Sequence, residues 1–387
     1  MDTLALASRP CPNNAFGSNS FNIYNVTMIS LLAAFFASFF TTLLIIRFKH
    51  LHGKFSGDHD LLGPQKFHTG SVPRIGGISI AIGILAAILV GLQANGATSL
   101  KVTLLLCAIP TFAIGLTEDL TKKIGVKTRL LFTAFAAALV LYFLDISIIR
   151  LDIWGIDYLL SIPAIAIVFT VFAITGLANA YNIIDGFNGL SSMVGIITLL
   201  GLAYVSYLFQ DTAILQLSFI MIGAILGFFI WNYPRGLIFL GDGGAYLIGF
   251  WIAALSVLLI ARHPSISPWF ALLINAYPIL ETLFTIYRRK IHQGKSPGLP
   301  DGIHFHTLIY RRILNTAAAK SKFDFLNANA RTAPYLWLLS SFAVVPAILW
   351  WQSTPMLVAF TLVFAISYVW LYAKIVRFKT PGWMHPY

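Results

Sequence analysis

Residues 160–209 consist of two apolar runs around one polar stretch: LSIPAIAIVFTVFAITGLA, NAYNIIDGFNG and LSSMVGIITLLGLAYVSYLF. Each outer run is close to the length that an α-helix needs to cross a bilayer. The middle stretch, residues 179–189, carries one carboxylate and three amides, which are costly to place within a membrane. It is therefore either a short polar loop or the floor of a site.

The polar stretch has helical spacing. Side chains three residues apart on a helix are turned by about 60°, so Asn179, Asn182 and Asp185 are expected to share one sector. Gly186 and Gly189 are expected to end or bend that helix.

Composition places the whole chain in a membrane. Apolar residues make up 58% of the sequence, charged residues only 10%, and the mean hydropathy is +0.80, which is typical of an integral membrane protein. The apolar runs are continuous, whereas a transmembrane β-barrel would show alternating residues. We therefore predict an all-α polytopic membrane protein without a large soluble domain.

Eleven apolar runs are candidates for membrane-spanning helices. They cover about residues 28–46, 76–92, 102–117, 130–144, 160–178, 190–209, 213–231, 244–261, 269–287, 336–351 and 357–375. We expect a periplasmic tail at 1–27, one transmembrane domain at 28–375 and a cytoplasmic tail at 376–387. The segment 145–159 alternates loosely and is expected to form a small hairpin at the outer surface.

The distribution of charge predicts the orientation. All but four of the 26 Lys and Arg lie in segments that an outside N-terminus would place in the cytoplasm. The loops predicted to face the cytoplasm are 47–75, 118–129, 179–189, 232–243 and 288–335. The positive-inside rule therefore predicts an outside N-terminus and a cytoplasmic C-terminus. The net charge of +12 is explained by this topology, so we expect no nucleic acid as a partner.

Polar clusters gather in the loops predicted to face the cytoplasm. Lys66, His68 and Arg74 precede the second run; they form either a basic membrane anchor or a phosphate-binding group. Glu118 and Asp119 end the third run, where adjacent carboxylates are costly unless a cation lies beside them. The alternative for this acidic pair is a solvated helix end.

Further polar residues lie toward the C-terminus. Asp242 stands between two glycines, either as a turn residue or as a carboxylate exposed to a ligand. Glu281 lies within the ninth run, as a packing partner of a neighbouring cation or hydroxyl or as a site residue. His304 and His306, followed by Arg311, are either surface residues or part of an anion-recognising or metal-adjacent loop.

These clusters together suggest a class of chemistry. Carboxylate and amide oxygens with few sulfur ligands favour Mg²⁺, with Mn²⁺ as the second choice. A carboxylate-held Mg²⁺ with Lys and Arg is typical of phosphoryl transfer. The sequence contains no P-loop, so it does not indicate ATP hydrolysis at such a loop.

In order and content, the polar blocks resemble those of the polyprenyl-phosphate N-acetylhexosamine-1-phosphate transferases. This membrane superfamily, glycosyltransferase family 4, includes MraY and WecA. The matching blocks are Lys66–Gly77, Glu118–Arg129, Asn179–Gly189, Asn232–Gly244 and His304–Arg312. The Asn-x-x-Asn-x-x-Asp-Gly and Gly-Asp-Gly blocks are its most specific parts.

The resemblance implies an activity and a set of site residues. The activity is transfer of a sugar 1-phosphate from a UDP-sugar to undecaprenyl or another polyprenyl phosphate, with release of UMP. The implied catalytic residues are Glu118, Asp119, Asp242, His304 and His306. Of the carboxylates, Asp242 and Asp185 are implied as Mg²⁺ ligands, and Asp119 acts at the lipid phosphate. The implied substrate-binding residues are Lys66, His68, Arg74, Lys127, Asn179, Asn182, Asp185, Asn188 and Arg311.

Three positions depart from the family pattern. Glu118 stands where the family usually has aspartate, Asn188 where MraY and WecA carry Asp, and Thr307 where the family has a third histidine. Asn188 is the first position at which we would look for a difference in donor. Eleven spans resemble the WecA-like branch more than MraY, which has ten.

The WecA-like branch implies UDP-GlcNAc or a related donor and the start of a surface polysaccharide such as O antigen. It further implies a multi-pass protein of the bacterial inner membrane with its active site on the cytoplasmic face; a homodimer is left open. One alternative is MraY-type transfer of phospho-MurNAc-pentapeptide in peptidoglycan synthesis. Another is a transporter or lipid flippase, whose carboxylates should lie near the membrane midplane and not at one face.

Overall fold

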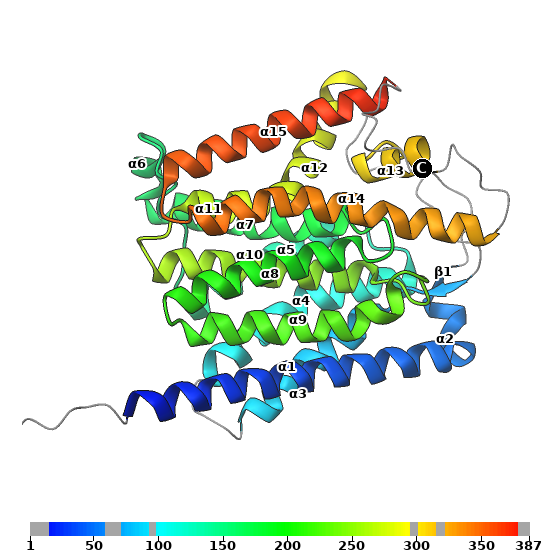
Figure 1. Cartoon of the computed structure of the whole chain (residues 1–387), viewed down its shortest axis with the longest axis horizontal. Coiled ribbons are helices and arrows are strands. Elements are labelled where there is room, and N and C mark those ends of the chain that lie inside the picture. Colours follow the sequence, from blue (N-terminus) through cyan, green and yellow to red (C-terminus); the bar gives the residue numbers. More distant parts are fainter. Residues whose placement is uncertain (1–14, 59–70, 93–97, 295–300, 315–321, 378–387) are drawn as a thin grey trace, which may run out of the picture.

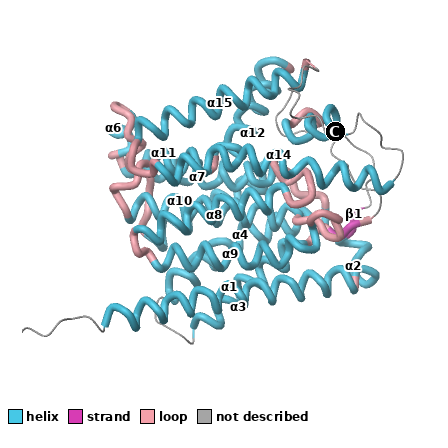
Figure 2. Tube along the Cα trace, in the orientation of Figure 1, coloured by secondary structure: helices cyan, strands magenta, loops and turns pink. Residues whose placement is uncertain are grey.

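The computed structural model of the chain describes residues 15–58, 71–92, 98–294, 301–314 and 322–377. Its elements are α1 (Ala15–Arg47), α2 (Lys49–Ser56), β1 (Gly57–Asp58), β2 (Val72–Pro73), α3 (Gly76–Leu92), α4 (Thr98–Thr121), α5 (Val126–Leu144), α6 (Ile156–Leu160), α7 (Pro163–Ile183), α8 (Leu190–Leu208), α9 (Thr212–Asn232), α10 (Gly241–Arg262), α11 (Pro268–Ile274), α12 (Ala276–Tyr287), η1 (Arg288–His292), α13 (Phe305–Ile309), η2 (Tyr310–Leu314), α14 (Lys322–Leu349) and α15 (Thr354–Val376). Figure 2 shows helices almost throughout; the two short strands pair antiparallel. The predicted all-α fold class is confirmed.

Each of the eleven predicted apolar runs coincides with a helix or a helix pair. Within the described residues, nine helices are long and apolar enough to cross a membrane: α1, α4, α5, α7, α8, α9, α10, α14 and α15. The ninth predicted run is the pair α11 and α12, bent by 76°, and the second is the shorter apolar helix α3. The chain is thus a multi-pass membrane protein. The count of eleven spans and the orientation of the termini stay predictions.

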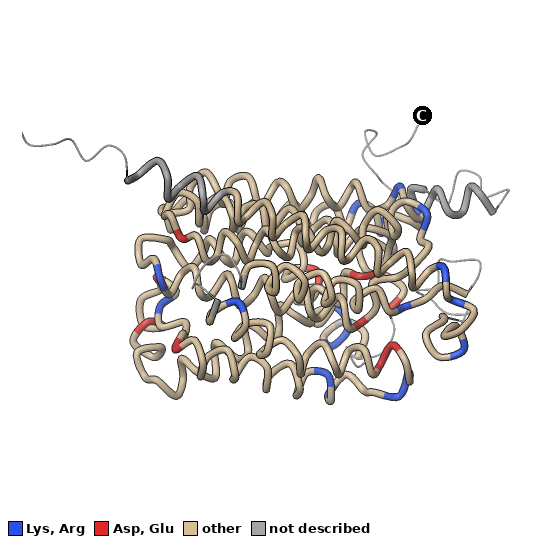
Figure 3. The backbone as a smooth tube through the Cα atoms, turned by 90° about the horizontal axis from the view of Figure 1, so that it is seen from below, with Lys and Arg blue, Asp and Glu red and all other residues tan. Residues whose placement is uncertain are grey.

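The long helices lie side by side and turn around at two ends of the bundle (Figure 1). At one of these ends, α4, α7 and α9 finish and α5, α8 and α10 begin. The same end holds the two strands and α13, and we call it the polar end. Figure 3 shows that most Lys and Arg of the described residues gather there.

α10 runs through the middle of the bundle, and nearly all of its side chains are buried. It packs against α3, α4, α7 and α8. Because lipid is as apolar as the helices, their association depends on close packing, which small residues allow. Gly77 of α3 lies against Gly244 of α10, where a Cβ added at Gly77 would be only 2.4 Å from the Gly244 nitrogen. This contact brings the start of α10 next to the start of α3.

The predicted hairpin at 145–159 is wrong. The segment is an irregular loop followed by α6, and its hydrogen bonds go to other groups instead of a strand ladder. The Leu151 nitrogen donates to the Asp157 carboxylate at 2.6 Å, and the Leu151 carbonyl accepts from the Trp269 indole at 2.9 Å. The Arg150 guanidinium donates to the Ile266 carbonyl at 2.7 Å. Side chains of Asp157 and Trp269 thus satisfy both backbone groups of Leu151 without a partner strand.

The close contact between α3 and α10 makes a testable prediction. Gly77→Ala would place its methyl group against the α10 backbone, so we expect a loss of about 1–3 kcal/mol in stability, as for an overpacked core. Gly176→Ala in α7 is the matched control, since an added Cβ there meets nothing within 4 Å. Thermal unfolding of both variants in detergent measures the difference. Equal melting temperatures would contradict the proposed tight contact.

Candidate active site

A buried carboxylate joins the end of α4 to the start of α10. Asp119 is 1% exposed; its Oδ1 accepts from the Asp242 nitrogen at 2.8 Å and its Oδ2 from the Gly243 nitrogen at 2.9 Å. The first backbone N–H groups of a helix have no partner within the helix, and the helix dipole favours negative charge beside them. Asp119 therefore holds the first turn of α10, and with it the side chain of Asp242, in place.

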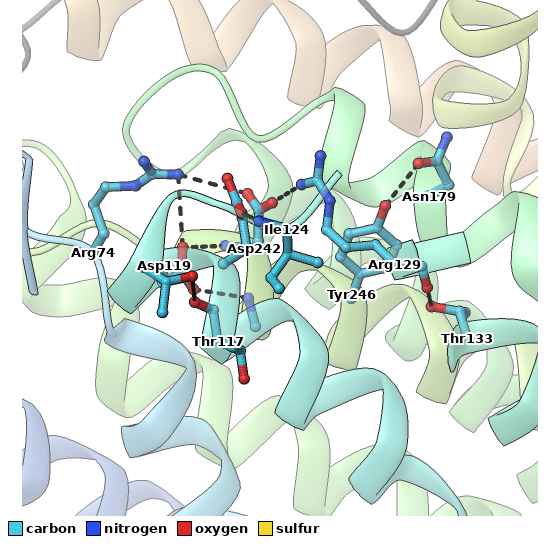
Figure 4. A network of polar contacts seen from close by, with 12 residues as sticks. Arg74, Thr117, Asp119, Ile124, Arg129, Thr133, Asn179, Asp242 and Tyr246 are labelled. Carbon is cyan, nitrogen blue, oxygen red and sulfur yellow. Dashed lines mark hydrogen bonds and ion pairs between the residues drawn. The ribbon is translucent and has the colours of Figure 1, made fainter. Parts of the chain in front are cut away.

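Two guanidinium groups lie beside the two carboxylates (Figure 4). Nη2 of Arg74 is 3.6 Å from Oδ1 of Asp119 and 3.7 Å from Oδ1 of Asp242. Nη1 of Arg129 donates to Oδ2 of Asp242. Four segments of the chain thus contribute two anions and two cations, Asp119, Asp242, Arg74 and Arg129, which we call the arginine–aspartate group. Asp242 is the carboxylate that both arginines share.

The glycine before Asp242 has a specific role. Gly241 has φ +76°, a left-handed conformation that favours glycine. A Cβ added there would lie 2.0 Å from the Arg74 carbonyl and 2.5 Å from Oδ2 of Asp119. Asp242 lies in the first turn of α10, so the alternative of an idle turn residue is wrong.

The polar stretch 179–189 ends α7, as Gly186 and Gly189 predict. The prediction that Asp185 shares a helical sector with Asn179 and Asn182 is wrong, because the helix ends before Asp185. The helix runs to Ile183, and Asp185 lies in the turn that follows. Asn179 accepts a hydrogen bond from the Tyr246 hydroxyl at 2.9 Å, and the Tyr246 ring lies 5.9 Å from the guanidinium carbon of Arg129 (Figure 4). Asn182 is half-buried on the last turn of α7. The stretch therefore adjoins the arginine–aspartate group.

Asp185 belongs to the same electrostatic neighbourhood. Burial raises the pKa of its carboxyl to about 7, and the nearby Arg74 guanidinium lowers it in part. A carboxyl in this range gains from a further cation beside it, because an opposite charge favours its ionised form.

Asn188 makes contacts that hold loops together. It is 4% exposed; its amide nitrogen donates to the Pro234 carbonyl at 3.1 Å, and its backbone nitrogen donates to the Asn329 side chain at 3.1 Å. The next residue, Gly189, donates to the Asn232 side chain at 2.6 Å. These bonds join the 184–189 turn to the loop after α9 and to α14. A substrate-binding role for Asn188 stays a prediction.

His304 and His306, which we call the histidine pair, are buried at 6% and 2% exposure, so the surface alternative is wrong. Their rings stack with centroids 5.1 Å apart. Nδ1 of His304 lies 3.1 Å from Oε1 of Glu281. Glu281 is therefore the buried partner of His304, which the sequence predicts as a site residue. Burial lowers the pKa of His306 to about 3, so this ring is neutral.

The remaining predicted site residues are Glu118, Lys127, Arg311, Lys66 and His68. Glu118 is half-buried and accepts from the Ile124 nitrogen at 2.6 Å, which closes the turn between α4 and α5. Lys127 and Arg311 are exposed. Lys66 and His68 lie outside the described residues.

Arg129 is the main residue that the sequence prediction missed. The choice of Lys127 over Arg129 had no basis in composition, because both belong to one basic run. Helical periodicity places Arg129 and Thr133, four residues apart, on one face of α5. In the structure, Thr133 is buried and shares a hydrogen bond of 2.8 Å with Thr111 of α4. The face of α5 that carries Arg129 thus turns toward α4 and α10.

The donor set fits a Mg²⁺ that is shared with a substrate. Among the described residues, no group of three or more His, Cys, Asp or Glu side chains could hold a metal ion by itself. Mg²⁺ is commonly held by one or two carboxylates, with phosphate oxygens and water as its other ligands. Asp242 is partly exposed and Asp185 lies near Arg74, whereas both oxygens of Asp119 are engaged by backbone N–H groups. Asp242 and Asp185 are therefore the carboxylates that could hold such an ion.

Comparison with known proteins matches this arrangement. Residues 101–260 match the model of glycosyl transferase family 4. The undecaprenyl-phosphate alpha-N-acetylglucosaminyl 1-phosphate transferase of Escherichia coli O157:H7 is 31% identical over 279 residues, covering 70% of this chain and 74% of that protein. The chain belongs to glycosyl transferase family 4. The predicted superfamily and the predicted enzyme class, a sugar-phosphate transferase, are confirmed.

Two further relatives carry different names. The decaprenyl-phosphate N-acetylglucosaminephosphotransferase of Mycolicibacterium smegmatis is 28% identical, covering 73% of each chain. The phospho-N-acetylmuramoyl-pentapeptide-transferase of Streptococcus pyogenes serotype M6 is also 28% identical, covering 66% of this chain and 78% of that protein. Family membership therefore leaves the choice of sugar open.

Arg129 offers a direct test of the site. Arg129→Ala removes one of the two cations beside Asp242, so we expect sugar-phosphate transfer to fall about 100-fold, in line with the loss of one transition-state donor. Lys123→Ala, on the exposed turn before α5, removes the same charge and should retain activity. UMP release by both variants decides the matter. Full activity of Arg129→Ala would exclude Arg129 from the site.

Asn188 gives a second prediction. Asn188→Asp replaces the donor to the Pro234 carbonyl with an acceptor, so we expect a stability loss of about 1–3 kcal/mol, as for an unsatisfied buried group. Thermal unfolding in detergent measures this loss. Assays with two UDP-sugars show whether the preference of the enzyme for one of them changes. A changed preference at unchanged stability would identify Asn188 as a donor-binding residue.

Proposed function

We propose that the chain transfers N-acetylglucosamine 1-phosphate from UDP-GlcNAc to undecaprenyl phosphate, with release of UMP. The observation that carries the proposal is Asp242 at the start of α10, shared by Arg74 and Arg129. Positioning and neutralisation of charge supply most of the catalysis in phosphoryl transfer. A partly exposed carboxylate between two arginines supports both.

Each residue has a part in binding a pyrophosphate. Arg74 and Arg129 carry planar forks of N–H donors that match phosphate oxygens, so they would bind the donor and neutralise its charge. Asp242 and Asp185 would hold Mg²⁺; when bound, the ion stabilises charge on the departing phosphate. Asp119 keeps Asp242 in place through the α10 backbone. Preorganised groups of this kind need not rearrange during the reaction.

The placement of charge favours a transferase over a transporter. Asp119, Asp185 and Asp242 lie at the polar end, where helices begin and end, and not halfway along the bundle. A polyprenyl phosphate keeps its chain in the bilayer and its phosphate at the interface, which suits a site at a helix end. We infer that the polar end faces the cytoplasm of a bacterium, because Lys and Arg concentrate there (Figure 3).

The identity of the donor sugar rests on the relatives. Two of the compared proteins are named as N-acetylglucosamine transferases, which supports UDP-GlcNAc. The phospho-N-acetylmuramoyl-pentapeptide-transferase of Streptococcus pyogenes supports UDP-MurNAc-pentapeptide as the second candidate. With GlcNAc as the sugar, the product would begin a surface polysaccharide such as O antigen.

A metal-ligand variant tests the proposal. Purified enzyme with Mg²⁺, undecaprenyl phosphate and UDP-GlcNAc should release UMP, and Asp242→Asn should reduce kcat at least ~1,000-fold because the amide cannot replace the carboxylate as a ligand. EDTA should abolish activity and added Mg²⁺ restore it.

The matched control is Asp145→Asn, an exposed aspartate at the opposite end of α5, which should behave as wild type. UMP release from UDP-MurNAc-pentapeptide but not from UDP-GlcNAc would favour the second candidate. Release from neither sugar, or full activity of Asp242→Asn with EDTA present, would refute the proposed reaction.

A further inference from the structure

Glu281 is a buried carboxylate in the bent pair α11 and α12, outside the arginine–aspartate group. It is 1% exposed. Its Oε1 accepts from the Phe305 nitrogen at 3.1 Å and lies 3.1 Å from Nδ1 of His304. Its Oε2 accepts from the Tyr368 hydroxyl at 2.9 Å. A carboxylate at this depth is expensive unless its oxygens are satisfied, and both oxygens of Glu281 have partners.

These contacts orient His304. A carboxylate only accepts hydrogen bonds, so Nδ1 of His304 carries the proton that points to Glu281. In the neutral ring, Nε2 is then the acceptor. The Thr285 hydroxyl oxygen lies 3.2 Å from the same Nδ1, so Glu281 and Thr285 together face this side of the ring, and Glu281 is the charged acceptor that favours the proton on Nδ1.

The His306 ring packs against two rings, those of His304 and Phe187. The two histidine rings stack at an interplanar angle of 16°. Nδ1 of His306 is buried and has no hydrogen-bond partner among the described residues. A Cβ added at Gly186 would lie 2.9 Å from Nε2 of His306, so the ring abuts the turn that carries Asp185. The histidine pair therefore extends from Glu281 to the edge of the active site.

α15 makes hydrogen bonds to Glu281 and to the segment that carries the histidine pair. Besides Tyr368, α15 contributes Tyr372, whose hydroxyl donates to the Ile303 carbonyl at 3.0 Å. Nη1 of Arg312, just after the histidine pair, donates to the Ile375 carbonyl at 2.9 Å. α15 lies beyond residues 101–260, the segment that matches the family model. α15, the most C-terminal helix of the described residues, is thus tied to a loop of the site.

We propose that Glu281, held by Tyr368, is the positioning residue of the histidine pair. The pair faces the turn that carries Asp185 only while Glu281 fixes the His304 ring and the stacked His306 ring follows. The inference rests on the proposed transferase function and adds the reason why α12 and α15 contribute buried polar groups to it.

A double-mutant cycle on the full-length enzyme tests the proposal, with UMP release from UDP-GlcNAc as the assay. We expect Glu281→Ala and His304→Ala each to lower kcat about 100-fold, and the double variant to be no slower than His304→Ala, because residues that act as one unit are not additive. Glu281→Gln keeps an acceptor for Nδ1 and for the Phe305 nitrogen, so it should recover kcat to within about tenfold of wild type.

Tyr368→Phe covers the case in which Glu281→Ala does not fold. It should lower kcat about three- to tenfold and leave the KM for UDP-GlcNAc unchanged, and this loss should vanish in the His304→Ala background. Tyr204→Phe, an exposed tyrosine of α8, is the matched control and should equal wild type.

The outcomes separate the two proposals. A wild-type enzyme that releases UMP from neither UDP-GlcNAc nor UDP-MurNAc-pentapeptide would refute the transferase function. With an active wild type, additive losses in either cycle, full activity of His304→Ala, or unchanged kcat in Glu281→Ala and Tyr368→Phe would overturn the positioning role.

Discussion

The bonds from Asp119 to the first turn of α10 are the constraint on which the site depends. A helix that begins inside a membrane protein exposes backbone N–H groups that lipid cannot satisfy, so a partner must be supplied by the protein. Asp119 supplies it with both carboxylate oxygens. The buried charge then requires a cation, and Arg74 stands 3.6 Å away. Helix start, carboxylate and cation are thus coupled, and Asp242 is placed as a consequence.

A second buried carboxylate repeats this principle at a different level. Glu281 satisfies a backbone N–H and a tyrosine hydroxyl, and it approaches a histidine instead of an arginine. Asp119 accepts hydrogen bonds from the start of α10. Glu281 accepts a hydrogen bond from the start of the short helix α13 and lies beside the ring of His304, the residue before that helix. Both carboxylates fix a stretch of backbone near the polar end by accepting from its N–H groups. Rigid helices support such positions more accurately than free loops.

Asn188 shows how a departure from the family pattern is accommodated. Its amide nitrogen donates to a backbone carbonyl, which an aspartate in its ionised form cannot do. The neutral residue at this position is therefore explained by its neighbours in this chain. The change from aspartate to asparagine thus has a structural reason that does not require a different UDP-sugar.

The sequence alone was sufficient for the all-α membrane class, for the placing of every apolar run on a helix, and for the end of α7 near Asp185, because continuous hydrophobicity and helical spacing are local properties. The hairpin at 145–159 failed because weak alternation says nothing of side chains such as Asp157 that satisfy the backbone from outside a ladder. The family blocks identified most of the residues around Asp242.

Only the tertiary structure decided which residues meet. The pairing of Arg129 with Asp242, and of Glu281 with His304 and Tyr368, joins segments far apart in the chain. Periodicity can give the face of a helix, but the choice between Lys127 and Arg129 depends on which helix packs beside that face. Long-range packing sets these contacts, since burial makes each unpaired polar group costly and so selects the arrangement in which they pair.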